Sequence, residues 1–165
     1  MAVLIATPGA IDANSYATVA EGDLYHETRL HVTEWTGATM VTKTAAIIWA
    51  TRLLNDHFDW SGTITTETQA LPWPRYSAYD TRGVLIEQTV VPQELKNATA
   101  ELARLLIIAD REAEPETAGI NSMSVGSLAL SFNPNDRNKV IRKDIIMMLA
   151  SFSEPKNSMF KRVVR

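Results

Sequence analysis

The sequence predicts a mainly α-helical fold: a small bundle of about four helices with a long Pro/Trp loop, a short β-hairpin and extended termini. Three observations support this expectation. Apolar residues recur at helical spacing in several segments, Gly, Pro and Thr interrupt residues 61–91, and residues 120–132 alternate polar and apolar residues around a glycine. At 165 residues the chain is long enough for one domain with a buried core.

The first helix is predicted from a capping signal. Thr18 and Glu21 fit a capping box, in which each side chain bonds to the backbone N–H of the other residue, so a helix is expected over residues 19–29. Residues 30–40 have no helical period and are expected to be irregular, with Trp35 packed beneath the loop.

Two longer helices are predicted from apolar periodicity. Thr42 is expected to cap a helix over residues 43–57, with a core face formed by Ala45, Ile48, Trp49, Arg52 and Leu53. Pro92 suits the first position of a helix that continues to about residue 111. Its apolar stripe is the strongest in the chain and consists of Leu95, Ala98, Leu102, Leu105, Leu106 and Ala109.

The C-terminal third is expected to hold the hairpin and one more helix. The hairpin spans residues 120–132 and turns at Gly126, and Asp136 can cap a helix over residues 137–152. We therefore predict a helical domain over residues 1–152, with the inserted loop 61–91 and the hairpin 120–132. Residues 153–165 would follow as a basic C-terminal arm.

Charge is distributed unevenly along the chain. The net charge is −3, but residues 1–136 hold eight Lys and Arg against seventeen Asp and Glu, whereas residues 137–165 hold eight Lys and Arg against two acids. A basic arm of this kind suits an acidic protein surface, nucleic acid, solubility, or the acidic body of a neighbouring copy.

The sequence gives no sign of catalysis. It has no cysteine, no nucleophile elbow, no P-loop and no dinucleotide-binding glycine pattern. Its three histidines, His26, His31 and His57, are not at the spacing of a metal site. No apolar run approaches the about 18 residues that a membrane span needs. We expect no enzyme activity, no cofactor, no metal and no membrane partner.

The most informative segment is the octet Thr68–Arg75, which contains Leu-Pro-Trp-Pro-Arg. Each proline fixes its own φ and extends the residue before it, so the segment is expected to be stiff. A stiff loop that presents Leu71, Trp73 and Arg75 would lose little entropy when a partner covers it. The alternative is that Trp73 folds back onto the core of its own domain.

This octet and its setting resemble the head–tail adaptor (connector) proteins of tailed bacteriophages, a family catalogued in part as DnaT-like ssDNA-binding proteins. The resemblance covers most of the first 132 residues. It is carried by Asn14-Ser15-Tyr16, Ala20-Glu21-Gly22-Asp23-Leu24-Tyr25-His26, Ala50-Thr51-Arg52-Leu53-Leu54, Thr68–Arg75 and Val91-Pro92-Gln93-Glu94-Leu95-Lys96.

The resemblance implies a structural protein of the virion neck, assembled in the host cytoplasm. About twelve copies would form a ring below the portal protein, present a platform to the next tail or neck component and let genome DNA pass through the lumen. Leu71, Trp73 and Arg75 would be the contacts of the loop. From charge and position we add a contact region in the arm, formed by Lys161, Arg162, Val163 and Val164.

A second hypothesis is a single-stranded DNA-binding accessory protein. The basic residues Arg137, Lys139, Arg142 and Lys143 would contact phosphates together with the arm. Phe152 and Phe160 are the aromatic residues that could stack on bases. Against this hypothesis, the rest of the chain is acidic.

Overall fold

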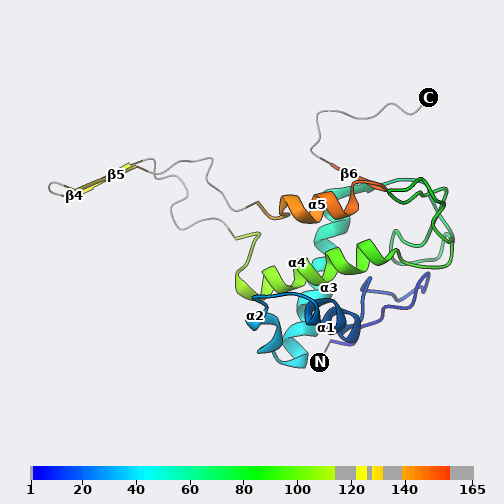
Figure 1. Cartoon of the computed structure of the whole chain (residues 1–165), viewed down its shortest axis with the longest axis horizontal. Helices are drawn as coiled ribbons and strands as arrows, with labels where there is room; N and C mark the ends of the chain where they lie inside the picture. The colour runs from blue at the N-terminus through cyan, green and yellow to red at the C-terminus, as the bar shows by residue number, and fades with distance from the viewer. Residues whose placement is uncertain (1, 114–121, 126–127, 132–138, 157–165) are drawn as a thin grey trace.

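The computed structural model describes residues 2–113, 122–125, 128–131 and 139–156, and it is mainly α-helical, as predicted (Figure 1). Within these residues there are five helices, α1 (Val19–Glu27), α2 (Thr33–Thr36), α3 (Met40–His57), α4 (Gln93–Ile108) and α5 (Lys143–Leu149). The strands are β1 (Phe58–Trp60), β2 (Thr63–Ile64), β3 (Arg75–Tyr76), β4 (Ser122–Val125), β5 (Leu128–Ser131) and β6 (Ser153–Pro155). They form the antiparallel pairs β1–β6, β2–β3 and β4–β5.

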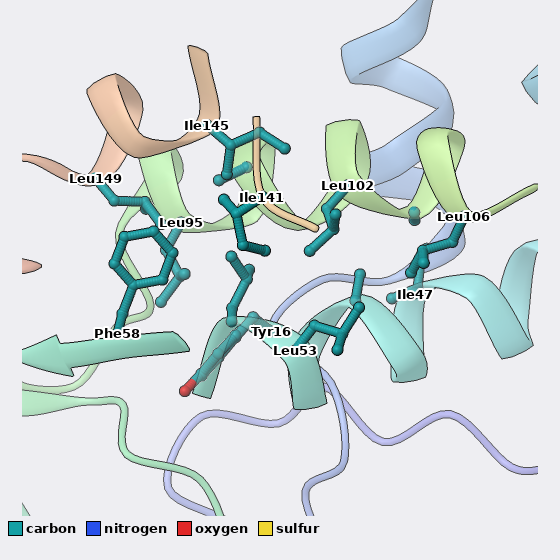
Figure 2. Packing of buried hydrophobic residues seen from close by; sticks show 14 of the residues in the cluster. Tyr16, Ile47, Leu53, Phe58, Leu95, Leu102, Leu106, Ile141, Ile145 and Leu149 are labelled. Carbon is teal, nitrogen blue, oxygen red and sulfur yellow. The ribbon is translucent and has the colours of Figure 1, made fainter. Parts of the chain in front are cut away.

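Helix α4 is the centre of the domain, because it contacts α1, α2, α3 and α5. Figure 2 shows how residues from α3, α4 and α5 meet in the core. The predicted stripe of α4 is confirmed except at Ala109, which ends the helix and is exposed. Burial extends around the helix to polar residues, including Thr99, Glu101 and Arg104. None of the described helices has the length and apolar content of a membrane span.

The capping box of α1 is confirmed, with the Thr18 hydroxyl accepting from the Glu21 N–H and the Glu21 carboxylate accepting from the Thr18 N–H. For α3 the predicted start was wrong. Thr39 rather than Thr42 is the N-cap, so the helix begins nearly one turn earlier, at Met40. Trp35 is buried as expected, although its segment contains the short helix α2.

The predicted core face of α3 was also wrong. Its buried residues are Ala46, Ile47, Ala50, Thr51, Leu53 and Leu54, so Leu53 alone of the predicted stripe is buried. Apolar residues occur on both sides of this helix. Periodicity alone therefore did not fix which side faces α4, and contacts with α4 decided it.

The last helix is shorter than predicted. Residues 139–142 are not helical, Arg142 is the N-cap of α5, and the helix ends at Leu149. Phe152 is then buried, and β6 pairs with β1 through the register Asp59↔Glu154. The first residues of the predicted arm therefore belong to the body of the domain.

Candidate functional site: the Pro/Trp loop and its pocket

The loop over residues 61–91 is held against the body by the Trp73 side chain, which is 1% exposed. The Trp73 ring lies edge-on to the rings of Trp60 and Phe152, with centroid distances of 6.1 and 5.2 Å. The Trp73–Pro74 peptide bond is cis. Trp73 is thus a core residue of the single chain, which answers the question that the sequence left open.

Arg75 fixes the shape of the loop from the other side. Its guanidinium donates hydrogen bonds to the carbonyl oxygens of Ser61 (2.7 Å), Pro72 (3.2 Å), Trp60 (3.3 Å) and Gly62 (2.6 Å). Burial lowers the pKa of Arg75, a shift that the nearby Tyr16 partly offsets. Only the planar, five-donor group of arginine can join so many carbonyls, so Arg75 braces two segments of the loop.

A pocket of about 360 Å³ lies where the loop meets β1 and the end of β6. Leu71 and Arg75 line it, while Trp73 stands behind its wall in the core. Its other lining residues are Asn55, Phe58, Asp59, Trp60, Ile64, Gln69, Ala70, Pro72 and Lys156. Two of the three predicted loop contacts therefore converge on one cavity.

Hydrogen-bond donors predominate among the polar groups of this pocket. The Asn55 side-chain oxygen accepts from the Tyr16 hydroxyl at 2.5 Å, which leaves the amide NH₂ of Asn55 as a donor. The Lys156 ammonium donates to the Asn55 carbonyl oxygen at 2.7 Å and keeps two further N–H groups. Asp59 is the single carboxylate of the lining. The pocket is therefore suited to an anionic oxygen.

Of the residues predicted to contact nucleic acid, the structure describes Lys139, Arg142 and Lys143. Arg142 pairs with Asp144 at 2.9 Å, and Lys143 is exposed at the start of α5. Lys139 lines a second pocket of about 650 Å³ with Val140, Ile141 and Ile146, and this pocket shares Phe58 and Lys156 with the first. Arg137 and the predicted arm contacts Lys161, Arg162, Val163 and Val164 lie outside the described residues.

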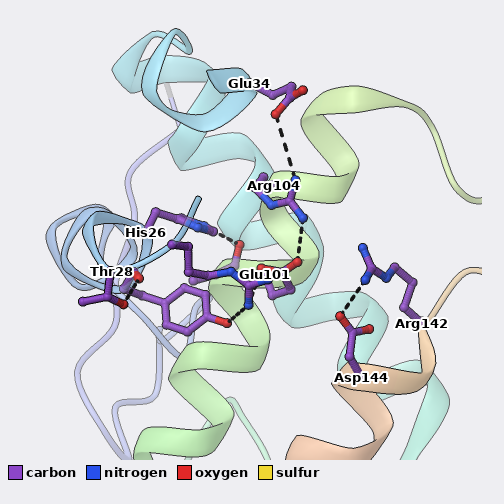
Figure 3. Close-up of polar contacts among 10 residues, drawn as sticks. His26, Thr28, Glu34, Glu101, Arg104, Arg142 and Asp144 are labelled. Atoms are coloured by element: carbon purple, nitrogen blue, oxygen red, sulfur yellow. Dashed lines mark hydrogen bonds and ion pairs between the residues drawn. The ribbon is translucent and has the colours of Figure 1, made fainter. Parts of the chain in front are cut away.

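A partly buried ionic network joins α4 to Arg29, which follows α1, and to Glu34 in α2 (Figure 3). Glu101 is fully buried and accepts from the Arg104 guanidinium at 2.7 Å, while Arg29 lies 3.4 Å from its second oxygen. Arg104 also lies 4.0 Å from Glu34 in α2. Because a lone buried charge is costly, these contacts require α1 and α2 to keep their places against α4.

His26, in α1, lies next to this network and contacts the backbone of α4. Its Nε2 lies 3.1 Å from the carbonyl oxygen of Ala100, and its Nδ1 is buried without a hydrogen-bond partner in the described part of the chain. Burial lowers the pKa of His26, and the Ala100 contact only partly offsets this. His26 is therefore held neutral and structural. No group of three or more His, Asp and Glu side chains in the described ranges is placed to hold a metal ion.

Sequence reasoning did not identify Asn55, Lys156 or Glu101 as candidate residues. Asn55 and Lys156 are separated by 101 residues and come together only because β6 pairs with β1. The one available signal for Glu101 was its place within the apolar stripe of α4, with Arg104 one turn later.

The described residues define a mainly α-helical domain with a stiff, braced loop and a donor-rich pocket beside it. The whole chain, residues 1–165, matches the model of the family described as "Putative DnaT-like ssDNA binding protein", and it belongs to this family. No curated protein matches the chain, and no solved structure does. The family description names single-stranded DNA as a ligand, so the connector role stays a prediction.

Proposed function

We propose that the protein is a structural head–tail adaptor of a virion neck, in which about twelve copies form a ring under the portal protein. The observation that carries this proposal is the hairpin β4–β5. Its strands pair over four residues each, from Ser122↔Ser131 to Val125↔Leu128, and they lie away from the helices (Figure 1).

An isolated two-stranded hairpin is at best marginally stable in water. The backbone edges of β4 and β5 can also pair with a strand of another chain. The hairpin therefore gains stability when a second molecule covers it. A helical body with a projecting hairpin suits an assembly in which each copy reaches the next copy or the portal.

The charge of the body supports the same proposal. Residues 1–136 are strongly acidic, and most of their basic side chains pair with carboxylates, as Lys96 does with Glu21 and Lys43 with Asp23. An acidic surface repels the phosphates of DNA, so a ring of such bodies would let genome DNA slide through its lumen.

The test is native mass spectrometry and electron microscopy of the protein mixed with its portal. A ring of copies on the portal is the expected result. A variant in which residues 120–132 are replaced by a Gly/Ser linker should keep the helical content of the monomer and lose the ring. A parent protein that stays monomeric and never joins the portal would contradict the proposal.

Single-stranded DNA binding is a second candidate function, and the family description is the observation that favours it. It predicts that affinity for an oligonucleotide falls steeply as salt rises, because released counterions drive phosphate binding. Lys139→Gln and Lys143→Gln test the surface predicted from the sequence. Binding that is absent at low salt would remove this candidate and leave the adaptor proposal intact.

A further inference from the structure

We infer that the pocket between the Pro/Trp loop and β6 binds one nucleotide of a single-stranded nucleic acid. The phosphate would lie between Arg75 and Lys156, and the base would lie on the apolar wall formed by Leu71 and Pro72. This inference rests on the second candidate function and gives it a binding site different from the residues predicted from the sequence.

The two cations of the pocket carry charge that no carboxylate compensates. In the described ranges, most basic side chains pair with a carboxylate, namely Arg29, Lys43, Arg52, Arg82, Lys96, Arg104 and Arg142. Arg75 and Lys156 have no such pair in these ranges, and neither do Arg111, Lys139 and Lys143. The hydrogen bonds of Arg75 and Lys156 go to carbonyl oxygens, which carry no net charge. Two positive charges thus line one cavity, and a phosphate would satisfy both.

The pocket also has a suitable size and lining. Its volume of about 360 Å³ falls within the range of small-ligand sites, and Ile64, Leu71 and Pro72 supply apolar surface beside the cations. Arg75 already braces the loop through four carbonyl oxygens. The wall is therefore formed before a ligand arrives, and binding costs little ordering entropy.

Asp59, the single carboxylate of the lining, repels a bound phosphate and so lowers the affinity of the pocket for it.

Two substitutions with opposite expected effects test the site. In fluorescence anisotropy with a labelled oligo-dT and the full chain, Lys156→Gln should weaken binding by about two- to fivefold, the loss of one exposed ion pair with a phosphate. The salt dependence of log K should flatten by about 0.7, the value for one phosphate of a single strand. Asp59→Asn should tighten binding by about two- to threefold, because it removes a like charge from the ligand's surroundings.

Arg52→Gln is the matched control. It removes one exposed basic side chain that pairs with Glu112 and does not line the pocket, and it should bind like the parent. Circular dichroism of each variant shows whether the fold is kept. Lys156 and Asp59 are both exposed, so neither substitution is expected to unfold the domain.

The outcomes separate the site from the function. If the parent binds oligo-dT but Lys156→Gln and Asp59→Asn bind equally well, and Lys143→Gln is weakened instead, the pocket is not the site although the function stands. If no oligonucleotide binds at low salt, both the pocket assignment and the proposed DNA-binding function are refuted. If Lys156→Gln changes the mass of a self-associated form and not oligo-dT binding, the pocket takes a carboxylate of a second copy, and the nucleotide assignment is overturned.

Discussion

Replacing Trp73 by alanine tests whether the octet belongs to the core or to an interface. Trp73 is 1% exposed and packs edge-on against Trp60 and Phe152. Removing so large a buried side chain leaves a cavity and should cost about 3–5 kcal/mol of the free energy of unfolding. In a chain of this length that corresponds to a fall in Tm of about 6–20 °C. This is a large share of the about 5–15 kcal/mol that stabilises a typical domain.

Urea unfolding followed by far-UV circular dichroism measures this change without depending on tryptophan fluorescence. Trp49→Ala is the control, because Trp49 is only partly buried and donates to the exposed Glu112. It should cost about 1–2 kcal/mol, for partial burial and one hydrogen bond. An unchanged urea midpoint for Trp73→Ala, together with a loss of portal binding, would refute the core assignment and make Trp73 an interface residue.

Three further changes probe the helical body. Gly22→Ala should destabilise the domain by about 1–3 kcal/mol through overpacking, because a Cβ at this position would lie 2.8 Å from the buried Trp35 ring. An unchanged Tm would mean that the ring can move aside. Glu101→Gln should cost about 3–5 kcal/mol, since it removes the buried carboxylate that pairs with Arg104 and leaves only the exposed Glu34, 4.0 Å away, to compensate that charge. In urea titrations the double variant Glu101→Leu/Arg104→Met should recover much of this loss, and no recovery would contradict the assignment of this cost to the broken ion pair. For His26 the pKa in the folded state lies below its ordinary value of 6.5, so the unfolded state takes up the proton first and stability falls as the pH drops below that value. His26→Gln should remove this part of the pH dependence, while His31→Gln, at an exposed position, should not.

Sequence signals that depend on residues close together in the chain predicted parts of the fold reliably. The Thr18–Glu21 capping box and the apolar stripe of α4 were predicted correctly, because each depends on residues three or four positions apart. Helix α3 was predicted with the wrong core face, since apolar residues lie on both of its sides. Helix α5 was predicted too long, because its sequence does not show that residues 139–142 leave the helix.

The same contrast holds for the candidate site, where local patterns were informative and contacts between distant residues could not be predicted. Proline chemistry identified the Thr68–Arg75 octet as a stiff segment, and Leu71 and Arg75 do line a pocket. It could not say that Trp73 turns inward, because the rings that receive it come from β1 and from the segment before β6. The ion pairs of α4 with distant residues were hidden for the same reason, since Arg29, which pairs with Glu101, and Glu34, which pairs with Arg104, lie far from α4 in the chain.

The sequence by itself determined that this protein is mainly helical, roughly where its two longest helices lie, and that a basic C-terminal region follows an acidic body. These properties depend on composition and on spacing within one or two helical turns. Only the tertiary structure decided which helix faces are buried, that Trp73 is core, and that Lys156 and Arg75 line one pocket together with Asn55. Those outcomes depend on the pairing of β6 with β1 and on packing around α4, which bring together residues that no local pattern connects.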